Sequence, residues 1–201
     1  MPFEPTDEQA AILRHAHNAD GVILAGPGTG KSATVVAYVE SLAVAEEPPR
    51  VRLLTFTRAA TSELALKVSE HPSIEAERPS TIHSFAISVL LRNLGCADFP
   101  MPLRMADDWE GDNLVRPTLA ARANVGLRDL DKLLHELESN WQSLREEDDP
   151  RIAPEVRARF LGAWNEHRRV YGYTLLSELP NLLRQALTRT TTIYLASTTS
   201  S

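Results

Sequence analysis

The chain has 201 residues, of which 43% are apolar and 24% charged, and its formal net charge is −6. These proportions are typical of a soluble globular protein with one domain or one domain with an insertion, and no stretch approaches the roughly 18 uncharged apolar residues of a membrane span. The acidic balance argues against a protein that coats nucleic acid through bulk charge, although it does not exclude a local basic groove.

The amino-terminal residues and the cysteine content favour a cytoplasmic protein. Residues 1–4 lack the basic start and the apolar run of a signal peptide. Cys96 is the single cysteine, so no internal disulfide is possible and a reducing compartment fits. No His or Cys stands near Cys96 in the sequence, so we assign it no metal-binding or nucleophilic role.

The first ninety residues alternate between helical and strand-like segments. Thr6 and Gln9 have the spacing of a capping box, and apolar residues follow at helical intervals. The predicted segments are a helix from Thr6 to Ala16, a strand at 21–25, a helix at 31–45, a strand at 51–57 and a helix at 58–70. This order predicts an α/β fold in which crossover helices join parallel strands.

The chain changes character after residue 92. Glycines and prolines between 93 and 117 break regular structure, and three more helices are predicted at 127–144, 154–171 and 175–187. We interpret residues 1–92 as the N-terminal part of a core domain, 93–172 as a helical insertion, 173–187 as the return to the core, and the Ser/Thr-rich residues 188–201 as a disordered tail.

A glycine loop follows the first predicted strand and matches the Walker A pattern, with Ala in place of the first Gly. Its residues are Ala25, Gly26, Pro27, Gly28, Thr29, Gly30, Lys31 and Ser32. In such a loop, backbone N–H groups and the helix N-terminus surround a phosphate. Lys31 reaches the β- and γ-phosphates, and the Ser32 hydroxyl binds Mg²⁺. The loop therefore predicts ATP and Mg²⁺ as cofactors; the alternative is a turn that merely joins a strand to a helix.

Five further side chains have both a binding and a structural interpretation. The Gln9 carboxamide suits the N6/N7 edge of adenine, or it only completes the capping box. At the end of the second strand, Phe56 stacks on a base or is buried, and Thr57 presents N–H groups to a phosphate or simply caps a helix. His83, with Phe85 two positions later, forms a platform for a base if the chain is extended, or packs in an ordinary core.

An acidic run, Glu146 to Asp149, precedes Pro150. A metal site is one interpretation of four successive carboxylates. Because the run follows an amphipathic helix rather than an apolar strand, we interpret it as a solvated helix end.

Together these segments resemble the UvrD/Rep/PcrA group of superfamily 1 DNA helicases. Gln9 resembles the family's Q motif, which reads adenine. The glycine loop at residues 25–32 resembles motif I, and residues 81–85 resemble motif Ib. Residues 55–60, with Glu63 and Leu64, resemble motif Ia, with Arg58 where the family usually has Asn. Order and spacing agree, so the resemblance favours the binding interpretation of Gln9, Phe56 and His83. It implies a RecA-like P-loop fold in which Phe56, Thr57, Arg58, His83 and Phe85 line a track for single-stranded DNA.

The resemblance ends soon after the return to the core. The family's next element is a strand ending in Asp-Glu-x-x-Asp, and no such segment occurs in the sequence. We therefore expect a truncated or frame-shifted product, or a partial sequence, that binds nucleotide without efficient hydrolysis or unwinding. The family function is ATP-dependent 3′-to-5′ DNA unwinding. The alternatives are a non-catalytic interaction module derived from a P-loop ATPase, and a small P-loop NTPase or kinase.

Overall fold

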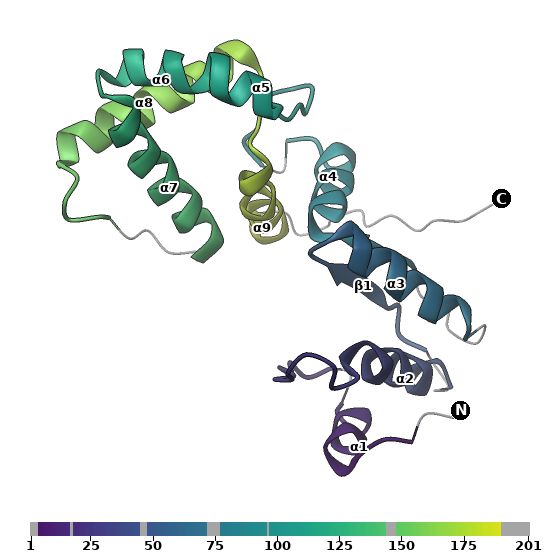
Figure 1. Cartoon of the computed structure of the whole chain (residues 1–201). Coiled ribbons are helices and arrows are strands. Elements are labelled where there is room, and N and C mark those ends of the chain that lie inside the picture. Colours follow the sequence, from purple (N-terminus) through teal and green to yellow (C-terminus); the bar gives the residue numbers. More distant parts are fainter. Residues whose placement is uncertain are drawn as a thin grey trace. The chain divides into compact units, whose positions relative to one another are not determined.

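A computed structural model describes residues 4–16, 18–44, 48–71, 77–95, 97–143 and 148–189 (Figure 1). Cys96, the first two residues of the acidic run and the Ser/Thr-rich tail from residue 190 onward lie outside these ranges. The chain divides into two compact units, which meet in the sequence between Ile82 and His83. Unit 1 precedes this boundary and unit 2 follows it.

Unit 1 contains a small parallel sheet with helices on its connections. Its elements are α1 (Asp7–Leu13), α2 (Lys31–Ala43), β1 (Arg52–Thr55), α3 (Arg58–Ser69) and β2 (Glu77–Thr81). The two strands are parallel, and Thr55 at the end of β1 lies opposite Thr81 at the end of β2. Val36, Val39 and Leu53 form the buried cluster that joins α2 to β1. The prediction of a mixed α/β chain with parallel strands is confirmed.

The prediction of a strand at residues 21–25 is wrong. These residues form no strand, and within the described ranges none pairs with them. Val22 is 87% exposed and Leu24 is 93% exposed. The run has high β propensity, but a strand also needs a neighbour that accepts its backbone hydrogen bonds and covers its side chains. Nothing in the described part of unit 1 supplies that neighbour.

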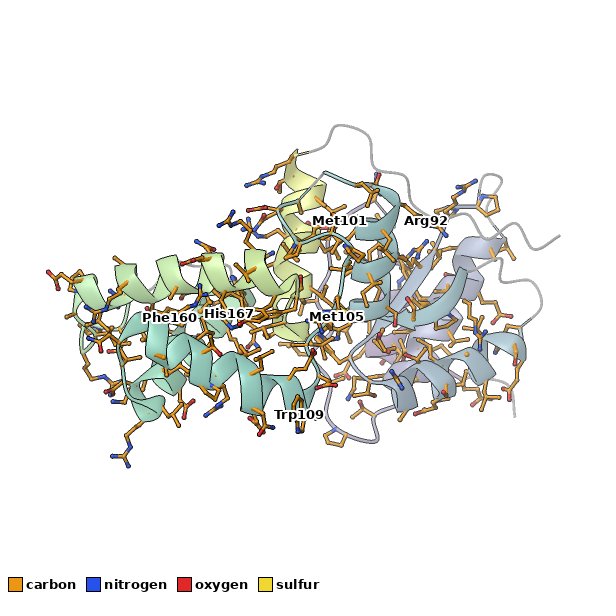
Figure 2. The ribbon with its side chains drawn as sticks, turned by 90° about the horizontal axis from the view of Figure 1, so that it is seen from above. Arg92, Met101, Met105, Trp109, Phe160 and His167 are labelled. Carbon is orange, nitrogen blue, oxygen red and sulfur yellow. The ribbon has the colours of Figure 1, made fainter. Side chains whose placement is uncertain are left out.

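Unit 2 is helical and has two hydrophobic clusters. Its elements are α4 (Ile82–Arg92, whose first residue belongs to unit 1), α5 (Asp108–Glu110), a π-helical turn (Gly111–Val115), α6 (Arg116–Ala123), α7 (Leu127–Ser143), α8 (Pro154–Tyr171), a 3₁₀ turn (Leu176–Glu178) and α9 (Leu179–Arg189). One cluster joins α4 to α9, and the other joins α6, α7 and α8. Phe160 lies in the second cluster (Figure 2). In the described part of the chain, no helix is both long and apolar enough to cross a bilayer.

The three helices predicted beyond residue 127 are confirmed. The prediction that residues 93–117 break regular structure is wrong for the second half of that range. Gly111 and Pro117 lie within one continuous helical segment from Asp108 to Ala123. The backbone widens to π geometry just before Pro117, and Arg116 N–H bonds to the carbonyl of Gly111. Because proline has no N–H to donate, it is tolerated where the helix changes its hydrogen-bond register.

Candidate nucleotide-binding site

The glycine loop turns sharply into α2 at two positions where only glycine is unstrained. Gly28 and Gly30 have φ angles of 75° and 77°, in the left-handed region that L side chains rarely adopt. Gly30 is also the N-cap residue of α2. A Cβ atom at Gly30 would lie 3.3 Å from the Gln9 Nε2 atom, so the position is crowded as well as strained. The two glycines thereby place Lys31 and Ser32 in the first turn of the helix.

The Lys31 side chain folds back over the loop. Its Nζ atom donates to the carbonyl oxygen of Ala25 at 2.9 Å and to that of Gly26 at 2.6 Å. The Thr29 hydroxyl also donates to the Gly26 carbonyl, at 2.9 Å. All these residues are exposed. Exposed hydrogen bonds exchange with water at small net cost, so an approaching anion can draw the ammonium group away from the carbonyls.

The N-terminus of α2 has the properties of an anion site. Gly30 has no side chain with which to cap the helix, and the first turn carries no acidic residue. The first N–H groups of a helix have no partner within it, and their partial positive charge favours an anion. The Ser32 hydroxyl, half-buried in the same turn, is available beside that anion. No cluster of three or more metal-ligating side chains occurs among the described residues, so Mg²⁺ held at Ser32 would depend on phosphate oxygens and water.

Gln9 caps α1 and also touches the glycine loop. Its Oε1 atom accepts the backbone N–H of Thr6 at 3.0 Å, while the Thr6 hydroxyl accepts the backbone N–H of Gln9 at 3.3 Å. The capping interpretation is therefore confirmed. The Nε2 atom donates to the Thr29 carbonyl at 3.3 Å, which joins the start of α1 to the loop. A contact to adenine would use the same carboxamide and remains a prediction.

The residues after β1 present an exposed aromatic beside a capped helix start. Phe56 is 82% exposed, so the interpretation as a buried Phe is wrong. Thr57 is the N-cap of α3, and its hydroxyl accepts the backbone N–H of Ala60 at 3.1 Å. Arg58 begins α3 and is exposed. An exposed ring, an exposed guanidinium and a helix N-terminus therefore follow one another at the end of β1.

Two threonines outside the predicted site residues hold this turn. The hydroxyls of Thr55 and Thr61 are 2.5 Å apart. Both donate to the carbonyl of Thr57, at 3.0 Å and 2.9 Å respectively. The bond from Thr61 can be expected from the sequence, because threonine hydroxyls in helices often bond to a carbonyl one turn earlier. The bond from Thr55, at the end of β1, depends instead on the turn that follows the strand.

The expectation that His83 and Phe85 share one side of an extended chain is wrong. β2 ends at Thr81, and both residues lie in α4. Residues two apart in a helix are about 200° apart around its axis, so the two side chains diverge. Phe85 is half-buried against the cluster that joins α4 to α9, which confirms ordinary packing for that residue. His83 is also half-buried.

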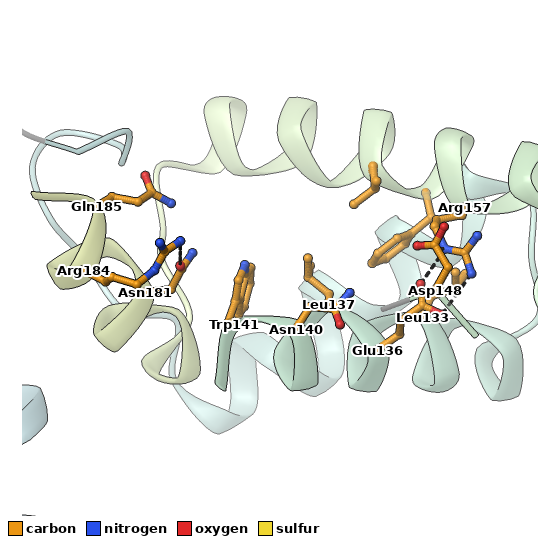
Figure 3. Close-up of a pocket in the computed structure, with 12 residues that line it drawn as sticks. Leu133, Glu136, Leu137, Asn140, Trp141, Asp148, Arg157, Asn181, Arg184 and Gln185 are labelled. Atoms are coloured by element: carbon orange, nitrogen blue, oxygen red, sulfur yellow. Dashed lines mark hydrogen bonds and ion pairs between the residues drawn. The ribbon is translucent and has the colours of Figure 1, made fainter. Parts of the chain in front are cut away.

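Unit 2 has its own hollow, bordered by α7, α8 and α9 (Figure 3). Its volume is about 480 Å³. Arg157 binds Glu136 at 2.6 Å and Asp148 at 3.3 Å at one end, and hydrogen bonds from Arg157 lower the pKa of Glu136. Asp149 pairs with Arg151 at 2.8 Å, and hydrogen bonds from Arg151 lower its pKa to about 2. These carboxylates of the acidic run therefore face arginines.

Comparisons with known proteins give a family match and several curated relatives. The family model of the UvrD/REP helicase N-terminal domain matches residues 5–186. An ATP-dependent helicase/nuclease subunit from Bacillus velezensis is 31% identical over 132 residues, which cover 54% of this chain and 10% of that protein. The corresponding subunit from Bacillus cytotoxicus is 28% identical over 169 residues, covering 72% of this chain and 13% of that protein. The chain thus matches only about a tenth of these relatives' length. The family model extends over most of the chain, which belongs to the UvrD/REP helicase N-terminal domain family.

Proposed function

We propose that this chain is the ATP-binding part of a UvrD-like, ATP-dependent DNA helicase. The observation that carries the proposal is the loop in which Gly28 and Gly30 adopt left-handed conformations and bring Lys31 and Ser32 to an uncapped helix N-terminus. The family match over residues 5–186 supports the same function, because members of this family are helicases by name.

Each residue of the site would have a defined task when Mg-ATP binds. The N–H groups of the loop and of the first turn of α2 would bind the β-phosphate. Lys31 would leave the carbonyls of Ala25 and Gly26 and neutralise the β- and γ-phosphates. Ser32 would bind Mg²⁺ through its hydroxyl. Gln9 would turn its carboxamide from the Thr29 carbonyl toward the adenine edge.

We further propose that the residues after β1 contact single-stranded DNA. Phe56 offers an uncovered ring on which a base can stack, and Arg58 offers a charge for a phosphate. Thr57 would contribute N–H groups at the start of α3. For His83 and Phe85, in α4, a DNA contact rests on the family resemblance alone, and Phe85 also packs against the cluster that joins α4 to α9.

A polypeptide of only these 201 residues should turn ATP over slowly. Hydrolysis needs a carboxylate that holds Mg²⁺, a group that orients water, and an arginine that stabilises the transition state and contributes about 10³–10⁵ in rate. The Asp-Glu-x-x-Asp segment that supplies the first two in this family does not occur in the sequence. We propose that 3′-to-5′ translocation requires a polypeptide that includes those groups.

The proposal is tested by thermal unfolding with and without Mg-ATP. A ligand present at 100 times its Kd stabilises the folded state by about 2.7 kcal/mol, so the wild-type transition should move upward. Lys31→Ala should abolish this shift. Lys67→Ala is the matched control, because Lys67 is a partly exposed lysine of the same unit that lies outside the glycine loop and pairs with Glu63 at 2.6 Å. If the wild-type chain shows no shift, the proposed function is wrong and the alternative of a non-catalytic interaction module is favoured.

A further inference from the structure

The chain passes twice between the two hydrophobic clusters of unit 2, and the two passages lie side by side. The first runs from α4 to α5 and the second from α8 to α9. Met105 and Thr174 form a parallel bridge between them. The backbone N–H of Thr174 donates to the Arg104 carbonyl at 2.7 Å, and that of Ala106 to the Thr174 carbonyl at 3.4 Å. Met105 is labelled in Figure 2.

One side chain, Arg168, binds both passages. It lies in the last turn of α8. Its Nη2 atom donates to the carbonyl oxygen of Asp98 in the first passage, at 2.7 Å. Its Nη1 atom lies 2.6 Å from the Glu178 Oε1 atom in the second passage. A guanidinium can do this because its donors form a rigid planar fork, whereas an ammonium group is a single point of charge.

The ion pair between Arg168 and Glu178 is buried and incompletely satisfied. The two side chains are 12% and 3% exposed. Within the described ranges the other carboxylate oxygen of Glu178, Oε2, is buried without a hydrogen-bond partner. Removing such charges from water costs several kcal/mol, and replacement by apolar residues is often neutral or stabilising. A pair of this kind is therefore a poor device for stability alone.

We propose that Arg168 is a positioning residue that fixes the orientation of the helices α5–α8 relative to the pair α4 and α9. It anchors the first passage through the Asp98 carbonyl and the second through Glu178. Ser177 adds a weaker link, because its hydroxyl donates to Glu138 of α7 at 3.0 Å. The inference does not depend on nucleotide or DNA binding, since every contact lies within unit 2.

The orientation can be measured by electron–electron distance spectroscopy on the whole chain. Nitroxide labels replace Leu94, which follows α4, and Leu127, which begins α7, in a Cys96→Ser background. Both leucines are more than half exposed. We expect one narrow distance distribution in this background and a broad one in Arg168→Met. Arg169→Met, at the exposed neighbouring position on α8, should leave the distribution narrow.

Two further variants separate positioning from stability. The double variant Arg168→Met/Glu178→Leu removes both buried charges, so we expect its melting temperature to return to wild type or above while the distances stay broad. Arg168→Lys keeps the charge near Glu178 but cannot hold both passages, so its distribution should also broaden. If the double variant recovers a narrow distribution, or if Arg168→Met never loses it, the positioning role is overturned.

Discussion

Replacing the buried Glu178 with Gln should change how the stability of unit 2 depends on pH. Glu178 is 3% exposed. Burial, opposed in part by Arg168 and reinforced by the nearby Asp98 charge, raises the pKa of Glu178 from 4.5 to about 7. Between these two pH values the folded state holds a proton that the unfolded state releases. The wild-type free energy of unfolding should therefore fall as the pH rises through this window.

The magnitude follows from the two pKa values. A difference of one pH unit corresponds to about 1.4 kcal/mol, so the interval from 4.5 to about 7 corresponds to about 3 kcal/mol. This stabilisation is fully present below pH 4.5 and is lost once the pH passes 7. Glutamine does not titrate, so Glu178→Gln should lack this part of the pH dependence. The free energy of unfolding of Glu178→Gln minus that of wild type should therefore rise by about 3 kcal/mol between pH 4.5 and pH 8.

Tryptophan fluorescence during urea unfolding is a suitable assay for this difference. Trp109, Trp141 and Trp164 are the chain's three tryptophans, and all lie in unit 2, so the signal reports on this unit. Burial lowers the pKa of His167, so over part of the pH range the unfolded state binds a proton that the folded state does not. This contribution makes the stability of both proteins rise with pH. That contribution largely cancels when wild type and Glu178→Gln are compared at each pH.

Two results would refute the reasoning. Parallel stability curves for wild type and Glu178→Gln would mean that the pKa of Glu178 is not raised by burial. A wild-type protein that instead gains stability over the variant as the pH rises would mean that attraction to Arg168 outweighs burial. In that case the pKa of Glu178 would lie below its ordinary value.

Three further substitutions test the loop, the core and the proposed DNA contact. Gly30→Ala should destabilise the fold by about 1–2 kcal/mol in circular dichroism melts, because φ is 77° and the new methyl group would meet Gln9. The control Gly162→Ala, in open space on α8, should be neutral or stabilising, and equal effects of the two substitutions would contradict this prediction. Phe160→Ala, at 1% exposure, should lower the free energy of unfolding by about 3–5 kcal/mol, and a loss below 1 kcal/mol would be inconsistent with its packing. Phe56→Ala should leave stability unchanged but weaken binding of a fluorescent single-stranded oligonucleotide by about 1–3 kcal/mol in anisotropy titrations, and undiminished affinity would remove Phe56 from the proposed track.

Local signals were sufficient to predict most of the helices. The apolar stripe of α7 includes Leu130 and Leu133, which are buried as their spacing indicates. The predicted caps at Thr6 and Thr57 both form. Side-chain spacing and helix capping involve residues within one or two turns of each other, so they can be recognised without knowing the tertiary fold.

Predictions failed where the outcome depended on distant neighbours. Residues 21–25 have the composition of a strand, but no described strand lies beside them. For both Phe56 and Phe85, a core position was the alternative to a contact with a base. Only Phe85 is covered, because α4 packs against α9, which is nearly a hundred residues later in the chain.

The sequence by itself determined the glycine loop, because a positive φ at Gly28 and Gly30 and a lysine at the helix start are local requirements of its shape. Only the tertiary structure decided that Arg168 and Glu178 would be buried together and would link two passages of the chain. The cost of burying a charge and the partner that offsets it depend on every element packed around it, and no local pattern of residues encodes that environment.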